Sequence, residues 1–207
     1  MCVGCLDDLR RLNTDVRQVC PTCAAFSANG SVCGACQNRP PPVQRLWASA
    51  RYQSPLPEIL HQWKHLRRSE LFHPLRLLML GNPPPWLDGD AADCVLAMPL
   101  SGRRRLMRGF NQSGELAEAA AAYCGLPLLP HNTVSREDRP PQSTLKKAER
   151  LRNVRKIFHV EKDIVKNRKV LLIDDVFTTG ASIFELAQTL AAAGAAGCSV
   201  WVAARNE

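Results

Sequence analysis

Apolar and polar residues follow one another in blocks that predict strands and helices in alternation. The apolar runs of strand length are residues 46–52, 93–99, 169–173 and 198–203. Helical spacing of apolar residues covers 58–80, 113–123 and 182–193. In the first of these helices, Ile59, Leu60, Trp63 and Leu66 are expected on one face, and Pro74 is expected to restart the helix.

Strands that alternate with helices favour right-handed crossovers, and therefore a mostly parallel sheet with helices on its faces. We expect such an α/β domain over residues 45–207. Residues 1–39 are Cys-rich and turn-rich, with little helical periodicity, and predict a small separate module. Residues 40–44 begin with three prolines and are expected to form a stiff linker between the two parts.

The composition of the 207 residues, 45% apolar and 22% charged, is that of a globular protein. No apolar run approaches the roughly 18–20 residues that a membrane span needs. Residues 1–8 have neither the basic nor the apolar region of a secretory signal. We therefore expect a cytoplasmic protein without a membrane span.

Six of the nine cysteines form three Cys-x2-Cys pairs within the first 36 residues, a pattern typical of metal ligands in a reducing compartment. Two such pairs can supply the four thiolates of one tetrahedral Zn²⁺, which would stabilise a segment too short to bury a large core. The spacing allows two combinations, and each leaves one pair unused. They are Cys20, Cys23, Cys33 and Cys36, or Cys2 and Cys5 together with Cys20 and Cys23.

A buried strand ends in two adjacent carboxylates, Asp174 and Asp175, and a small hydroxyl- and glycine-rich loop then opens a helix. Backbone N–H groups and hydroxyls at a helix start suit a phosphate group. The two carboxylates suit the vicinal hydroxyls of a ribose, with Mg²⁺ offsetting their charge. The loop consists of Thr178, Thr179, Gly180, Ala181 and Ser182.

Basic residues are concentrated in two stretches that suggest a phosphate-rich partner. The net charge is +8: residues 103–108 carry +4, residues 136–156 carry +5, and the rest of the chain carries −1. The first stretch leads into Arg108, Asn111 and Gln112, which could contact a substrate edge or hold the loop. The second stretch, with Gln142, Arg150 and Asn153, is compatible with a charged mobile loop over a site and nearly as compatible with a solvated amphipathic helix.

The segment 170–182 resembles the phosphoribosyl-pyrophosphate (PRPP) binding motif of type I phosphoribosyltransferases. The order of motifs along the whole chain resembles the ComF/GntX family: N-terminal Cys pairs, then Arg108-Gly109-Phe110-Asn111-Gln112, then Asp174-Asp175-x-x-Thr178-Thr179-Gly180-x-Ser182. The resemblance implies a phosphoribosyltransferase-like C-terminal domain and a link to natural competence, DNA uptake and the use of DNA as a nutrient. It also implies contact with DNA-uptake or recombination proteins.

Residue roles follow from the same resemblance. Asp174 and Asp175 would hold the ribose at the catalytic centre, and residues 178–182 would hold the 5′-phosphate. The pyrophosphate would bind at Ser101 and Arg103, and the family favours the later four cysteines, Cys20 to Cys36, for zinc. Family members usually carry one more Cys pair, so we expect the true start codon to lie upstream. A threonine of the family is replaced by Pro140, which affects the expected mobile loop.

Two function classes remain open from the sequence. The first is an enzyme that transfers phosphoribosyl from PRPP to an unidentified acceptor, such as a nucleobase or single-stranded DNA, with Asp175 as a weak candidate base. The second is a non-catalytic factor that responds to PRPP or binds single-stranded DNA. A structural adaptor would leave the Asp-Asp pair and the following loop without a role.

Overall fold

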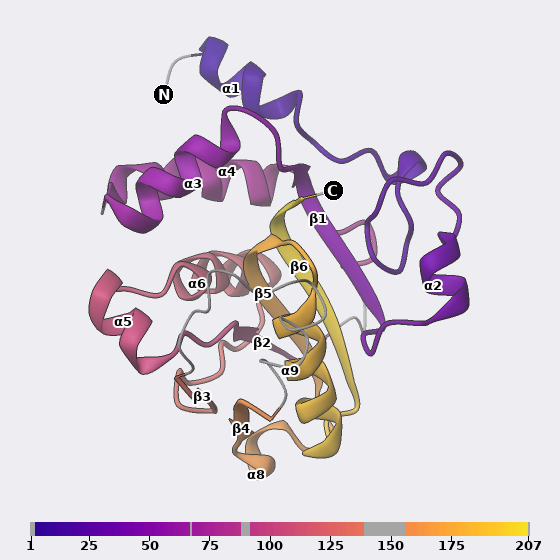
Figure 1. The fold of residues 1–207 in the computed structure, drawn as a ribbon, viewed down its shortest axis with the longest axis vertical. Helices are drawn as coiled ribbons and strands as arrows, with labels where there is room; N and C mark the ends of the chain where they lie inside the picture. Colours follow the sequence, from indigo (N-terminus) through magenta and orange to yellow (C-terminus); the bar gives the residue numbers. More distant parts are fainter. Residues whose placement is uncertain (1–2, 67, 88–91, 139–155, 207) are drawn as a thin grey trace.

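The computed structural model describes residues 3–66, 68–87, 92–138 and 156–206. Its main sheet has the strand order β1–β6–β5–β2, and every pair in it is parallel (Figure 1). The strands are β1 (Arg45–Arg51), β2 (Cys94–Ala97), β5 (Lys169–Phe177) and β6 (Gly197–Arg205). The expected fold class, a mostly parallel sheet flanked by helices with a Cys-rich module before it, is confirmed.

Helices cover both faces of this sheet because its strands are apolar on both sides. On one face, Val170 and Leu172 pack in the same cluster as Leu186 of α9 (Ala181–Ala192). On the other face, Leu171 and Ile173 pack with helices α3 (Leu56–His65), α4 (Phe72–Gly81) and α6 (Gln112–Cys124). The alternation of side chains along β5 thus supplies both halves of the core.

The helix expected over 58–80 is two helices, α3 and α4, with the short 3-10 helix η2 (Ser69–Leu71) shortly before α4. Leu66 caps α3 and is 61% exposed, so its expected place on the buried face was wrong. Pro74 lies in the first turn of α4, where its missing N–H costs no helical hydrogen bond. The helix therefore restarts at the turn that contains Pro74, as expected.

Two further elements differ from the expectation of basic loops. The first arginine run forms α5 (Gly102–Arg108). The second stretch begins in an antiparallel pair, β3 (Val134–Arg136) with β4 (Phe158–Val160), which is followed by α8 (Lys162–Val165). The expected mobile loop with Pro140, Gln142, Arg150 and Asn153 lies outside the described residues.

The N-terminal segment contains α1 (Val3–Arg10), η1 (Val16–Gln18) and α2 (Gly34–Asn38), so the expectation of little helix was wrong for α1. Leu9 and Leu12 are buried in the core cluster that includes Trp47 of β1. The Thr14 N–H donates to the Ser49 carbonyl oxygen at 3.0 Å. Within the described ranges, no helix combines the length and apolar character that crossing a bilayer requires.

Candidate functional site

The two aspartates lie on the last part of β5, which is longer than its apolar run. β6 pairs with β5 as far as Phe177, whereas β2 ends at Ala97. Directly after β2, the Met98 N–H donates to the Ile173 carbonyl oxygen at 2.8 Å. Asp174 and Asp175 therefore stand beyond the end of β2, at the carboxyl edge of the sheet. This is the edge at which ligands bind in open parallel sheets.

Asp174 is held by two donors in a partly buried position. The Ser113 hydroxyl donates to its Oδ1 at 2.7 Å, and the backbone N–H of Asp175 donates to the same oxygen at 2.9 Å. Burial, reinforced by the charge of Asp175, raises the pKa of Asp174 to about 7 despite these donors. The carboxyl group therefore exchanges its proton near neutral pH.

Asp175 is paired with a cation from another part of the chain. Lys64 Nζ, in the last turn of α3, lies 2.5 Å from Asp175 Oδ2. The Val176 N–H donates to the other oxygen of this carboxylate at 2.7 Å. Burial lowers the pKa of Arg108, and the nearby negative charge of Asp175 opposes that shift. Sequence reasoning missed Lys64, and no motif surrounds it.

The predicted phosphate-binding loop, residues 178–182 (called the phosphate loop below), turns sharply at Gly180, which has a φ of +73° and caps the start of α9. A Cβ at this position would lie 2.6 Å from Phe177 Cζ and 2.8 Å from Phe184 Cε2, so the backbone packs directly on two rings. The Ala181 N–H donates to Thr179 Oγ1 at 3.4 Å. The next N–H groups begin α9 and have no helical acceptor, which suits them to an anion.

Arg136 reaches this loop from β3. Its Nη2 lies 3.4 Å from the Ser182 hydroxyl oxygen, and its guanidinium stacks 5.4 Å over the ring of Phe158. Burial lowers its pKa, while the charge of Asp174 opposes that shift. Arg136 begins the second basic stretch of the sequence, and the structure places it beside the start of α9.

Ser101 and Arg103 hold a carboxylate of their own chain. Ser101 is buried at the N-cap position of α5, and the backbone N–H of Arg103 donates to Asp138 Oδ2 at 2.9 Å. The hydrogen bonds from Ser101 and from the Arg103 N–H lower the pKa of Asp138. The turn after β2 therefore accepts an oxyanion, and in this structure Asp138 supplies it.

Arg108, Asn111 and Gln112 connect α5, α6 and the end of β2. Arg108 Nη1 donates to Gln112 Oε1 at 3.1 Å, and Asn111 Nδ2 donates to the Met98 carbonyl oxygen at 3.1 Å. Asn111 Oδ1 and Gln112 Nε2 are buried without a hydrogen-bond partner among the described residues. Of the two sequence-based roles, holding the loop is the one that these contacts serve.

The four later cysteines come together in the N-terminal segment. Cys20, Cys23, Cys33 and Cys36 place their Sγ atoms within 4.8 Å of one another, and the Cys23–Cys33 pair is 3.7 Å apart. Metal–sulfur bonds of about 2.3 Å in a tetrahedron require sulfur atoms about 3.8 Å apart. The group can therefore hold one metal ion. Cys5 lies exposed on α1.

Backbone donors stabilise one thiolate of this cluster, that of Cys20, whereas burial raises the pKa of the Cys23 and Cys36 thiols. Burial raises the pKa of the Cys20 thiol, but N–H groups that include those of Cys33 and Thr22 outweigh it and bring that pKa to about 6. The Cys33 N–H lies 3.4 Å from Cys20 Sγ. A thiolate that is stabilised before the ion arrives is the form that binds a metal.

Arg205 links the cysteine cluster to the phosphate loop. Its Nη1 donates to the Cys23 carbonyl oxygen at 2.8 Å, and its guanidinium lies 4.6 Å over the ring of Phe177. That ring supports Gly180 and meets Phe184 edge-on at 5.7 Å. The sequence contained no sign of this connection, which depends on the pairing of Phe177 with Arg205 across β5 and β6.

Comparison with known proteins identifies relatives over nearly the full length. The DNA utilization protein YhgH of Escherichia coli K12 is 34% identical over 201 residues, which cover 95% of this chain and 88% of that protein. The chain belongs to the ComF/GntX family. Other relatives of this ComF/GntX protein are competence protein F of Haemophilus influenzae (27% identity, 84% of this chain and 78% of that one) and competence protein ComFC of Bacillus subtilis (27%, 95% and 80%). No family model matches the chain.

Solved structures resemble this ComF/GntX chain only distantly. Glutamine PRPP amidotransferase from B. subtilis has a TM-score of 0.46 and 16% identity, and the match covers 69% of this chain. An allosteric regulatory enzyme of purine biosynthesis has the same TM-score and 18% identity. In both cases the match spans 30% of the solved chain.

Proposed function

We propose that the protein binds PRPP and transfers its phosphoribosyl group to an acceptor, with release of pyrophosphate. The observation that carries the proposal is the continuous segment from Asp174 to Ser182, in which two carboxylates and a glycine-containing turn at a helix start follow one strand. The oxyanion-accepting turn at Ser101 and Arg103 follows the neighbouring strand β2. Parallel strands bring these two turns to the same edge of the sheet.

Each part of the site has a binding role in this proposal. Asp174 and Asp175 accept hydrogen bonds from the ribose hydroxyls, and Asp175 exchanges its contact with Lys64 for the sugar. The 5′-phosphate binds at the Thr178–Ser182 loop, where Arg136 adds a positive charge. The pyrophosphate takes the place of the Asp138 carboxylate at Ser101 and Arg103.

The reaction breaks the bond between ribose C1 and the pyrophosphate oxygen and forms a bond between C1 and the acceptor, whose proton passes to water. Positive charge develops at C1 as the leaving group departs, so the nearby carboxylates stabilise the transition state. Mg²⁺, when bound with PRPP, would neutralise charge on the pyrophosphate. The protein's own residues orient the ribose and hold the two phosphate ends apart.

Calorimetry with PRPP and Mg²⁺ tests the binding step, and a pyrophosphate-release assay with nucleobases and single-stranded DNA tests turnover. We expect the Asp175→Asn variant to bind PRPP at least tenfold more weakly, while binding of pyrophosphate alone changes little. Absence of PRPP binding by the wild-type protein would overturn the proposal.

We propose zinc as the ion of the cysteine cluster, in a structural role, because four thiolates in a tetrahedron favour it. We also propose that the chain consists of a metal module over residues 1–39, a linker over residues 40–44 and a phosphoribosyltransferase-like domain over residues 45–207. Elemental analysis of the purified protein should find one zinc per chain, and Cys36→Ser should remove it.

A second function, binding of single-stranded DNA without turnover, is favoured by the surface of α5. Arg103, Arg104 and Arg105 are all exposed there, and the neighbouring Leu106 is 85% exposed. Such binding would weaken steeply as salt increases. DNA binding that is salt-sensitive and indifferent to PRPP would favour this function over the transferase.

A further inference from the structure

Arg205 lies between the cysteine cluster and the phosphate loop, at the end of the central strand β6. Its register partner is Phe177, the last residue of β5, and β5 continues directly into the loop. The side chain of Arg205 contacts the N-terminal segment at Cys23 and the start of the loop at Phe177. A change on either side can therefore reach the other through this side chain.

The contact with the cysteine cluster is made to the backbone of a candidate metal ligand. Arg205 Nη1 donates to the Cys23 carbonyl oxygen at 2.8 Å, in a partly buried position. The Nε atom of the same guanidinium is buried and has no hydrogen-bond partner among the described residues. The position of the Cys23 carbonyl therefore determines whether Nη1 keeps its hydrogen bond as well.

A bound metal would fix the Cys23 carbonyl because it would hold Cys20 and Cys23 in one turn. Within this turn the Ala24 N–H donates to the Cys20 carbonyl oxygen at 2.8 Å. Ala24 has a left-handed φ of +55°, which is unfavourable for alanine and requires support from its surroundings. Without the ion, the four sulfur atoms, which lie within 4.8 Å of one another, would repel as thiolates. The Cys23 carbonyl is therefore expected to shift when the metal leaves.

The contact with the phosphate loop is made through an aromatic ring. The guanidinium of Arg205 lies 4.6 Å over the buried ring of Phe177. The same ring packs against Gly180, where a Cβ would meet it at 2.6 Å. Packing this close means that the ring and the backbone of the loop move together. The position of the guanidinium thus bears on the turn at Gly180, from which the first N–H groups of α9 follow.

We propose that the metal site and the phosphate loop are coupled through Arg205, so that metal binding strengthens the binding of a sugar phosphate at the loop. Loss of the metal releases the Cys23 carbonyl, the guanidinium and the ring in turn, and the loop loses affinity. Because coupling between two binding sites is reciprocal, a bound sugar phosphate strengthens metal binding by the same factor. The proposal rests on the proposed metal site and on the proposed phosphate-binding role of the loop.

Amide hydrogen exchange, measured by NMR on the metal-loaded and the chelator-treated protein, tests the coupling without a sugar phosphate. The reporter is the Phe184 N–H, which donates to the Gly180 carbonyl oxygen at 2.8 Å. Metal removal should speed its exchange at least about fivefold, the lower end of typical coupling. Elemental analysis confirms the metal content of both samples.

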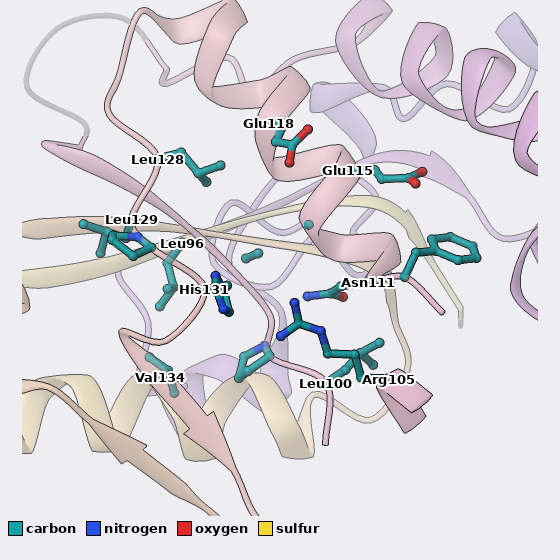
Figure 2. A pocket seen from close by; sticks show the side chains of 15 residues that line it. Leu96, Leu100, Arg105, Asn111, Glu115, Glu118, Leu128, Leu129, His131 and Val134 are labelled. Atoms are coloured by element: carbon teal, nitrogen blue, oxygen red, sulfur yellow. The ribbon is translucent and has the colours of Figure 1, made fainter. Parts of the chain in front are cut away.

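An internal control for this exchange lies at the β2 edge of the sheet. The Leu129 N–H donates to the Val95 carbonyl oxygen at 2.8 Å, beside a separate cavity of about 470 Å³ (Figure 2). Exchange at Leu129 should not change when the metal is removed. An unchanged rate at Phe184 overturns the proposal, and so does an equal increase at Leu129, which would mean that the metal stabilises the whole fold.

Calorimetry with ribose 5-phosphate on the same samples measures the effect on binding. The metal-loaded wild-type protein should bind this ligand at least about fivefold more tightly than the metal-free protein. In Arg205→Gln the two forms should bind alike, whereas Arg76→Gln, at an exposed position of α4, should keep the difference. A difference that persists in Arg205→Gln overturns the proposal. If the metal-loaded wild-type protein binds no ribose 5-phosphate, the proposed function fails, and the exchange experiment still decides the coupling.

Discussion

Replacing Gly180 with alanine tests whether the phosphate loop is supported by the two aromatic rings beneath it. The added Cβ would lie 2.6 Å from Phe177 Cζ and 2.8 Å from Phe184 Cε2, far inside the roughly 3.5–4.0 Å of a normal carbon contact. Moving packed rings to accommodate a methyl group costs about 1–3 kcal/mol. The left-handed backbone at φ +73° costs an alanine about 1–2 kcal/mol more. We therefore expect a total loss of about 2–5 kcal/mol in the free energy of unfolding.

Gly125→Ala is the matched control for this substitution. Gly125 has a similar φ of +65°, but no atom lies within 4 Å of where its Cβ would be. This variant should lose only the backbone contribution of about 1–2 kcal/mol. Urea denaturation measures the free energy of unfolding of both variants. The additional loss in Gly180→Ala is the cost of the contact between the new Cβ and the rings. Ribose 5-phosphate binding should also weaken for Gly180→Ala alone. Equal destabilisation of the two variants would refute the packing argument.

Three other substitutions test the surroundings of the site. The pKa of Asp174 is raised to about 7, so between about pH 4 and 7 the folded protein keeps a proton on this carboxyl group that the unfolded chain has lost. The free energy of unfolding should therefore fall as the pH rises from about 4 to 7. Asp174→Asn removes this loss, so its Tm relative to wild type should be higher at pH 8 than at pH 5, and an unchanged difference would contradict the assignment. Asp138→Asn should bind pyrophosphate several-fold more tightly in calorimetry, because the negative charge that occupies the Arg103 N–H is removed. Weaker binding would show that Asp138 does not compete with pyrophosphate. Arg205→Gln should weaken both ribose 5-phosphate binding and metal retention, the latter measured by elemental analysis. The exposed Arg76 of α4 supplies the control, since Arg76→Gln should leave both unchanged. Equal effects of the two variants would mean that Arg205 acts only on overall stability.

The fold and the main motif could be predicted because they depend on local patterns. A run such as Val170–Ile173 is apolar on both faces, which identifies a strand buried between two layers of helices. Gly125 ends α6 in the left-handed conformation, and such glycines are visible in the sequence. For the cysteines, spacing alone left two combinations open, and the resemblance to the ComF/GntX family favoured the later four, which the structure brings together.

The residues that sequence reasoning missed act across long separations. Lys64 meets Asp175 only because α3 packs on the sheet, and Arg205 meets Phe177 only because β6 lies beside β5. The extension of β5 through Asp174 has the same origin, since pairing with β6 overrides the low strand preference of aspartate. Such contacts are properties of the packed sheet and leave no trace in a window of neighbouring residues.

The central position of β6 also determines when the sheet can be completed during synthesis. Residues 197–205 are inserted between β1 and β5, so these strands have no hydrogen-bonded connection to each other until the ribosome has released the last stretch of the domain. Until then β1 exposes an unpaired edge, which is a hazard for aggregation in a nascent chain. A variant without residues 197–205 should therefore be insoluble rather than form a smaller folded domain.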